Sequence, residues 1–261
     1  MMSIATARRQ SRARLWAAAL FVLSSAASSA AQAPPPPPPP LWDSQVGAAF
    51  VGTSGNTDTS TFGADFVVNR RWPVWLMTAT AAAVRASDDG DRTAERYLGT
   101  FRADRTLSTL LSLTAGEKAE RDELAGMSFR NIVDGGLSWA LLRRPRWTID
   151  GLTSMAWIHE DPVEGPAVDS PAGVFQLLSK VPFAAAADTT QRVTYYPNFR
   201  DSSAYRSEAE ITAQAAMNSR LALKFGFLWR FSNEPVFGFE KTDTTTTASI
   251  VFRWRSDADA P

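Results

Sequence analysis

The sequence contains no cysteine and a single histidine, His159. The lack of cysteine excludes disulfide frameworks, thiolate metal sites, lipid attachment at a cysteine and a cysteine nucleophile. One histidine gives little basis for a metal centre, since such sites draw on several His or Cys ligands. We therefore predict no enzymatic activity, no cofactor and no metal, and we assign no catalytic, cofactor-binding or metal-binding residue.

The chain also lacks an excess of charge and a long apolar run. Its 261 residues include 27 basic and 27 acidic side chains. This balance offers no electrostatic basis for a polyanionic partner, so we expect no binding of nucleic acid. No apolar run reaches the roughly 20 residues that a membrane-spanning helix needs. Sustained helical periodicity is absent from residues 41–255.

The N-terminal region has the parts of a secretory signal peptide. The basic stretch MMSIATARRQSRAR precedes the apolar run LWAAALFVLSSAA, and small residues follow. We expect residues 1–30 to be a signal peptide with cleavage near 30–33. Residues 34–40 are all proline. The segment 31–40 is therefore predicted to be a semi-rigid polyproline II spacer.

From 41 to 255 apolar and polar residues alternate. In LALKFGFLWRF, residues 221–231, every odd position is large and apolar, whereas Lys224 and Arg230 occupy even positions. A period of two is typical of β-strands with two different faces. About twelve such segments follow one another along this range.

The connections between these segments are of two kinds. One kind is short and basic or polar: RRWP, the step at 105–106, LLRRPR, ADTTQ and NSR. The other kind is longer and richer in acidic residues: SGNTD, SDDGD, ERDELAG, EDPVEGPAVDSP, YPNFRDSS and SNEPVFGFEKTD. Short turns at one end and longer loops at the other are typical of outer-membrane barrels. We predict an all-β fold, a closed antiparallel up-and-down transmembrane β-barrel of about 12 strands over 41–255, followed by a polar tail at 256–261.

This fold assigns the two faces of each strand. The large apolar residues face lipid, and the charged residues face an enclosed polar lumen. The mixed signs of these charges fit two interpretations. The charges could form a ladder of ion pairs that holds the strand register, or they could line a narrow polar conduit. The lumen-facing charged candidates are Arg96, Arg102, Asp104, Lys118, Glu120, Arg130, Asp134, Glu208, Glu210, Lys224, Arg230 and Arg253.

Two other classes of protein compete with this interpretation. A soluble periplasmic protein, either lipocalin-like or a sandwich, would bury the apolar face inside and bind a ligand. An outer-membrane hydrolase would need a serine and an orienting partner at His159, and the sequence has no Gly-x-Ser-x-Gly motif. The acidic stretches at 88–91 and 122–123 lack the spacing of a complete calcium loop, and we expect them to be solvated loops.

Three motifs resemble a known family. They are GTSGNTDTST at 52–61, YYPNFRDSSAYR at 195–206 and KTDTTTTASIVFRW at 241–254. These motifs are similar to those of the salt-induced outer-membrane protein family, a domain-of-unknown-function group of secreted Gram-negative proteins. The resemblance covers essentially all of 41–255 and keeps the order of the motifs. It implies an outer-membrane β-barrel of unknown specific role and brings no catalytic residues. An envelope role linked to salt or osmotic stress and passive passage of small solutes are the functions that we consider for it.

These inferences also set the expected location and partners. We expect export to the cell outer membrane and contact with membrane lipid and lipopolysaccharide. Barrel-insertion machinery commonly reads a terminal aromatic, whereas here RSDADAP follows Trp254. Phe252 and Trp254 are therefore the aromatic residues available to that machinery. The protein is expected to be a monomer.

Overall fold

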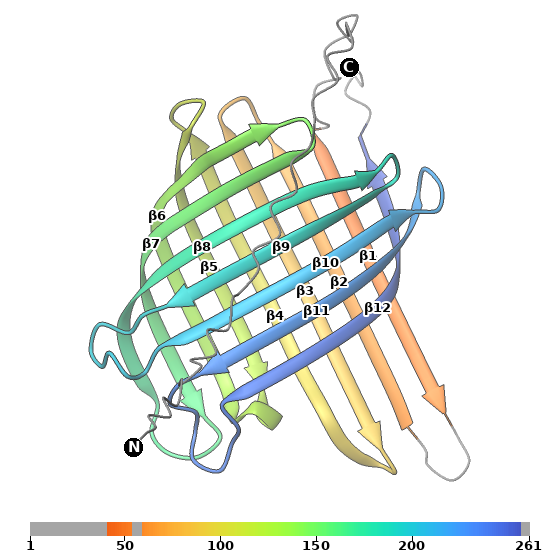
Figure 1. Ribbon diagram of the computed structural model, residues 1–261. Helices are drawn as coiled ribbons and strands as arrows, with labels where there is room; N and C mark the ends of the chain where they lie inside the picture. Colours follow the sequence, from red (N-terminus) through yellow and green to blue (C-terminus); the bar gives the residue numbers. More distant parts are fainter. Residues whose placement is uncertain (1–40, 54–58, 257–261) are drawn as a thin grey trace, which may run out of the picture. The chain divides into compact units, whose positions relative to one another are not determined.

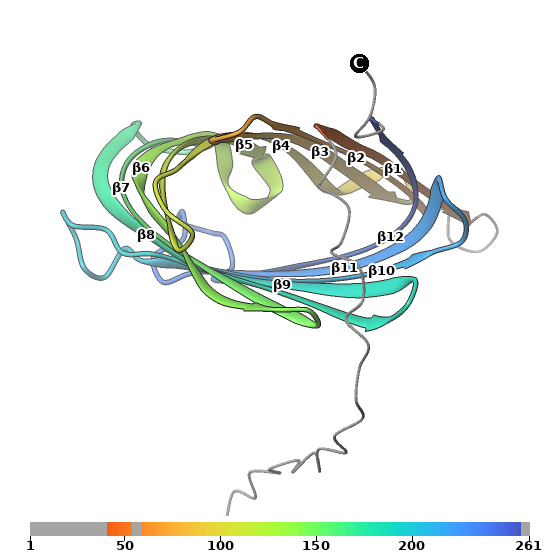
Figure 2. The ribbon, with the colours of Figure 1, turned by 90° about the horizontal axis from the view of Figure 1, so that it is seen from above.

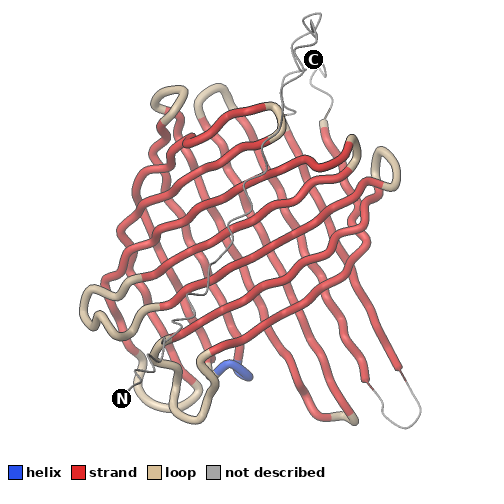
Figure 3. Tube along the Cα trace, in the orientation of Figure 1, coloured by secondary structure: helices blue, strands red, loops and turns tan. Residues whose placement is uncertain are grey.

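The computed structural model describes residues 41–53 and 59–256, nearly all of them in β-strands (Figures 1 and 3). The predicted signal peptide, the spacer, the loop at 54–58 and the tail from 257 lie outside the described residues. The strands are β1 (Trp42–Thr53), β2 (Thr59–Arg71), β3 (Trp75–Asp88), β4 (Asp91–Thr106), β5 (Leu111–Asp122), β6 (Met127–Arg144), β7 (Trp147–Pro162), β8 (Val168–Ala184), β9 (Ala187–Tyr196), β10 (Arg206–Ala216), β11 (Leu221–Ser232) and β12 (Thr242–Arg255).

These strands form a closed antiparallel barrel. Each strand pairs with the next one in the sequence, and β1 pairs with β12 to complete the ring, with Ser44 opposite Trp254. Figure 2 shows the ribbon from above, with the strands arranged in a ring. Closure leaves no unpaired strand edge, which is the condition for spanning a bilayer with strands. The predicted fold class, including the number of strands, is confirmed.

The strand register assigns each residue to the interior or the exterior. Glu208 lies opposite Arg230, which lies opposite Asp243, so this row shares one face across β10, β11 and β12. The next row, from Ala209 through Trp229 to Thr244, has the other face. The charged row is directed into the barrel and the row of Trp229 outward. The apolar alternation of 221–231 therefore forms the outer wall.

The exterior is an apolar belt with aromatic residues near both ends. At the end that carries the short turns, the exposed tryptophans include Trp42, Trp72, Trp75, Trp147 and Trp254. At the opposite end Tyr97, Trp157 and Tyr195 are exposed on the outer face. The guanidinium of Arg70 lies over the rings of Trp42 and Trp72, at 4.5 and 5.0 Å from their centroids. Such aromatic bands are typical of the two interfaces of a membrane.

Three of the predicted connections are wrong. The segment ADTTQ belongs to β9, since the turn lies at 185–186. The turn expected at 105–106 lies at 107–110, where the backbone N–H groups of Leu107 and Ser108 both donate to the carbonyl of Leu111. The predicted longer loop SDDGD is a two-residue turn at Asp89 and Gly90. Both of these residues have positive φ, 48° and 88°, which is the requirement of a tight hairpin.

The loops proper lie at the other end of the barrel and are longer on the side of β7–β12. They cover 163–167, 197–205 and 233–241, and a single turn of 3-10 helix, η1 (Glu123–Ala125), follows β5. Among the residues that the structure describes, no helix is long and apolar enough to cross a membrane.

Candidate functional site

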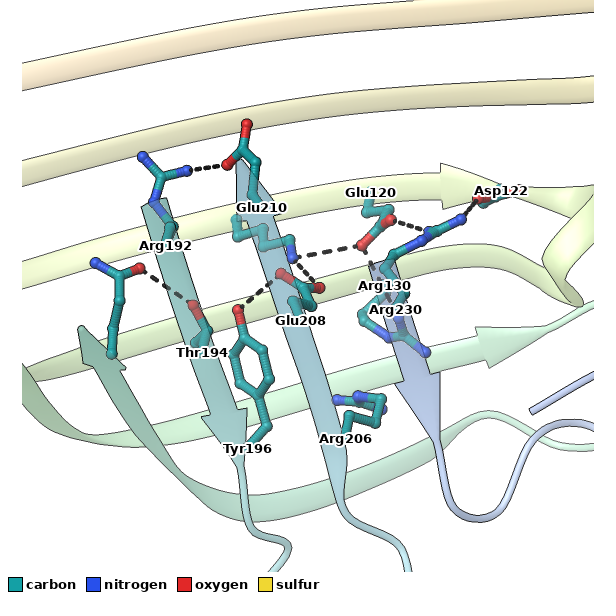
Figure 4. Close-up of polar contacts among 12 residues, drawn as sticks. Glu120, Asp122, Arg130, Arg192, Thr194, Tyr196, Arg206, Glu208, Glu210 and Arg230 are labelled. Carbon is teal, nitrogen blue, oxygen red and sulfur yellow. Dashed lines mark hydrogen bonds and ion pairs between the residues drawn. The ribbon is translucent and has the colours of Figure 1, made fainter. Parts of the chain in front are cut away.

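An ionic cluster crosses the interior of the barrel close to the loop end (Figure 4). It brings five basic side chains, Arg96, Lys118, Arg130, Arg206 and Arg230, against five acidic ones, Glu120, Asp122, Glu160, Glu208 and Asp243. These residues come from β4, β5, β6, β7, β10, β11 and β12. Balanced charges allow the groups to be buried together, which none could be alone.

Glu120 is at the centre of this cluster. Its side chain is only 1% exposed, and its Oε1 accepts hydrogen bonds from Nε of Arg96 at 2.8 Å and from Nη1 of Arg230 at 2.9 Å. Lys118 and Arg130 place their nitrogens 3.7 and 3.9 Å from Oε2. Four cations from four strands therefore lie within 4 Å of this one carboxylate. Loss of a buried partner leaves charges uncompensated in a medium of low dielectric constant.

A second link joins opposite walls of the barrel. Nζ of Lys118 on β5 donates to Oε1 of Glu208 on β10 at 2.6 Å, although these strands are not neighbours in the sheet. The same ammonium lies 5.5 Å from the ring centroid of Tyr196. The hydroxyl of Tyr196 is 3.5 Å from the other oxygen of Glu208. This link crosses the lumen and limits its width at this level.

The remaining members extend the cluster toward the loops. Glu160 at the end of β7 accepts from Nε of Arg130 at 2.5 Å and also from Arg206. Nη2 of Arg230 donates to Asp122 at 2.6 Å and lies 3.9 Å from Asp243. The sequence predicted a solvated loop at 122–123, but Asp122 is only 6% exposed. That prediction is wrong for Asp122 because β5 continues through this residue and its side chain faces the cations.

A separate ionic site lies nearer the turn end. Arg102 makes two hydrogen bonds to Asp134, at 2.8 and 3.2 Å, and a third to the hydroxyl of Thr114. Ser154 also donates to Asp134. A Cβ added at Gly116 would lie 2.6 Å from Nη2 of Arg102. Glycine at 116 therefore leaves the space that this bidentate pair occupies.

The other sequence candidates share the interior face without joining the cluster. Lys224 donates to Asp65 at 2.6 Å, and Arg192 donates to Glu210 at 2.8 Å. Asp104 lies opposite Thr114 in the register. Arg253 lies opposite Gln45. Arg192 and Glu210 pair between the adjacent strands β9 and β10, whereas the Lys224–Asp65 contact joins β11 to β2 past β12 and β1.

Four members of the cluster were not among the sequence candidates: Asp122, Glu160, Arg206 and Asp243. Asp65, the partner of Lys224, was also not among them. Each follows the same inward alternation as its strand, so the pattern contains the signal. Glu160 lies where β7 runs into the segment EDPVEGP, which the sequence indicates as a loop, and β7 continues past it to Pro162. Arg206 is the first residue of β10, within the strand that the alternation predicts.

Apolar side chains also fill part of the interior. Ile132, Leu152, Ile158 and Val174 are nearly inaccessible and form one cluster with three other buried residues on β6 to β9. At the loop end the ring of Phe239, from the loop at 233–241, packs on Gly126, where an added Cβ would approach it to 2.8 Å. Gly126 has φ of 79°, which other residues rarely adopt. The loop end of the lumen is thus narrowed from several sides.

The residues weighed as alternative sites have ordinary structural roles. Nδ1 of His159 lies 3.0 Å from the carboxylate of Asp169, which also accepts from the indole of Trp157. The register places these residues on the outer wall near the loop end. Within the described part of the chain, no group of three or more His, Asp or Glu side chains has a metal-holding arrangement.

An apolar exterior with aromatic bands, wrapped around an interior of paired charges, defines a transmembrane β-barrel protein. The chain belongs to the family described as "Protein of unknown function, DUF481", which matches residues 46–254. A search of curated proteins finds no match.

Among solved structures, the chain is similar to a NanC porin, with 10% identity, a TM-score of 0.48, and coverage of 81% of this chain and 96% of the other. It is similar to the KdgM porin, with 7% identity, a TM-score of 0.43, and coverage of 83% and 99%. It is also similar to the translocator domain of the autotransporter NalP from Neisseria meningitidis, with 11% identity, a TM-score of 0.40, and coverage of 82% and 86%. Likeness at this level carries no argument about function.

Proposed function

We propose that this protein is a non-enzymatic barrel of the Gram-negative outer membrane that allows slow passive passage of small polar solutes. The observation that carries the proposal is the ionic cluster that crosses the lumen beneath the loops. Its central carboxylate is 1% exposed, so the cluster forms a constriction and not a loose lining. Toward the turn end, polar groups such as Thr78, Thr80 and Gln176 share the interior face. A polar wall on one side of a charged constriction suits small hydrophilic solutes.

The proposal includes the location and partners of the barrel. The exterior belt would contact membrane lipid and lipopolysaccharide, with the longer loops on the outer side. Phe252 and Trp254 lie on the outer face of the last strand, with ring centroids 5.8 Å apart. These rings support recognition of β12 by barrel-insertion machinery. A role in osmotic stress rests on the family resemblance alone.

A structural role in the envelope is the second candidate function. The apolar cluster formed by Ile132, Leu152 and their neighbours, together with the ionic cluster, favours it because both occupy interior space. A barrel whose interior is completely filled by side chains conducts nothing.

Conductance in planar lipid bilayers separates these two functions. We expect small, steady unitary steps from the wild type and larger steps from the double variant Lys118→Ala/Glu208→Ala, because this change removes the link across the lumen without altering net charge. The matched control is Arg192→Ala/Glu210→Ala, which deletes an ion pair between adjacent strands of one wall. It should conduct like the wild type.

Silence of both the wild type and the Lys118/Glu208 double variant, with folding of each confirmed by heat-modifiable gel mobility, contradicts passage. That result favours the structural role.

A further inference from the structure

A carboxylate lies in the middle of the apolar exterior. Glu117 on β5 is exposed on the outer wall, and its neighbours across the sheet are Phe101 on β4 and Val133 on β6. These two neighbours are 48% and 52% exposed. The same row continues to Trp157 on β7. Glu117 thus lies inside the belt, away from both the turns and the loops.

One hydrogen bond accompanies this carboxylate. Nδ2 of Asn131 on β6 donates to Oε1 of Glu117 at 2.8 Å. Asn131 faces outward as well, since it lies opposite Ala119 on β5 and His159 on β7. An amide donates up to two hydrogen bonds, and a carboxylate accepts several. The second N–H of Asn131 and the second oxygen of Glu117 therefore require partners that hydrocarbon cannot supply.

The outward positions around this pair, on β3 to β6, include many small residues: Ala79, Ala81, Ala83, Gly99, Ala103, Ala115, Ala119 and Gly135. On the opposite side of the ring, β11 carries large outward residues, including Leu223, Phe225 and Phe227, each more than two-fifths exposed, while β10 and β12 carry both large and small ones. Small side chains let two backbones approach closely inside a membrane, as they do between packed helices.

A hollow of about 570 Å³ borders the same wall. Phe66, Tyr97 and Phe129 stand around it, and Gly99 and Ala119 are among the small residues that line it. Most of its lining residues are apolar, and Asp65, Glu120 and Arg121 also border it. Next to this hollow, Phe101 projects from β4. One surface therefore offers both a projecting ring and a concave place for one.

We propose that the outer wall of β4 to β6 is the contact surface for a second copy of this chain, arranged about a two-fold axis near Glu117. A two-fold contact requires a surface that is complementary to itself. Here the donor Asn131 and the acceptor Glu117 lie side by side, so each copy supplies what the other lacks. The free N–H of each Asn131 then donates to the Glu117 carboxylate of the other copy. This pairing satisfies four polar groups that lipid would leave unpaired.

The proposal replaces the monomer that the sequence predicted, and it is independent of solute passage. The large outward residues of β11 suit lipid, whereas the polar pair and the small residues beside it on β4 to β6 suit a protein surface. The one contact that decides it is between Glu117 and Asn131 of different copies.

Cross-linking in intact membranes tests this surface, because the chain has no cysteine of its own. Ala115→Cys introduces a thiol on the outer face of β5, one outward position from Glu117. Ala248→Cys is the matched control, since Ala248 is exposed on the outer face of β12. We expect mild oxidation to link Ala115→Cys into a species of twice the mass and to leave Ala248→Cys unlinked. Equal linking of both variants, or of neither, overturns the proposal.

A second measurement uses the cysteine-free protein. We expect the wild type to sediment as a dimer in mild detergent and Glu117→Leu to dimerise about tenfold more weakly, the range for a polar contact inside a membrane. Glu117→Gln, which keeps a hydrogen-bonding group, should weaken dimerisation less. Heat-modifiable mobility confirms that each barrel is folded. A folded wild type that stays monomeric at all concentrations, or a Glu117→Leu variant that dimerises like the wild type, contradicts the proposed contact.

Discussion

Replacing Glu120 with glutamine is expected to destabilise the barrel by about 3 kcal/mol, near the lower end of the cost of breaking a buried ion pair. Glutamine has nearly the same size as glutamate, so the effect reports the lost charge and not a cavity. Arg96 and Arg230 would each lose the carboxylate to which they donate, at 2.8 and 2.9 Å. Lys118 and Arg130, within 4 Å of the same group, would also lose a counter-charge. Urea unfolding in lipid vesicles, followed by tryptophan fluorescence, measures this change.

The control for this prediction is Glu210→Gln. Glu210 is also an interior carboxylate bound to arginine, but its side chain is 39% exposed and has Arg192 as its ion-pair partner. An exposed pair of this kind contributes about 1 kcal/mol or less. Equal losses of stability in the two variants would show that the ionic cluster around Glu120 contributes no more to stability than an exposed pair. That result would contradict a rigid constriction at this level.

The second large effect concerns the outer wall. Leu223→Arg places a guanidinium on the lipid-facing side of β11, where Leu223 is 52% exposed. A basic residue on the lipid face of a barrel costs about 2–4 kcal/mol near the bilayer middle and less near the interfaces, so we expect a loss of about 2 kcal/mol. The free energy of unfolding in lipid vesicles measures it.

Leu228→Arg is the matched control on the same strand. Leu228 lies on the interior face, opposite Glu210 on β10 and Thr245 on β12. An arginine there meets polar groups and a carboxylate, so its expected effect is much smaller. If Leu228→Arg were the more damaging variant, the interior would be the apolar core of a soluble barrel.

Much of this architecture could be predicted from alternation alone. Along β11 the odd residues face out and Lys224 and Arg230 face in, as the pattern of 221–231 indicates. The turns were harder, because a two-residue hairpin depends on local conformation. The sequence SDDGD indicates a polar loop, yet Asp89 and Gly90 both have positive φ and connect β3 to β4 in a two-residue turn.

The partners of the interior charges could not be predicted. Alternation states which face a side chain has, but not which strands oppose each other across the lumen. The Lys118–Glu208 contact joins residues 90 positions apart, and no local pattern contains that information. The position of Glu117, in contrast, could be predicted from the sequence. The alternation that places Leu113 and Ala115 outside also places Glu117 outside, so its unusual position was readable from the sequence.

The orientation of β11 is the central claim, and site-directed spin labelling tests it most directly. Single cysteines at each position from 221 to 231, introduced into this cysteine-free chain and labelled in lipid vesicles, report contact with lipid-soluble oxygen and with a water-soluble nickel reagent. We predict a period of two, with oxygen contact highest at odd positions such as Leu223, Phe225 and Phe227 and low at the even positions between them. Oxygen contact without this period, or odd positions that meet the nickel reagent instead, would contradict a barrel whose aromatic face lies in lipid.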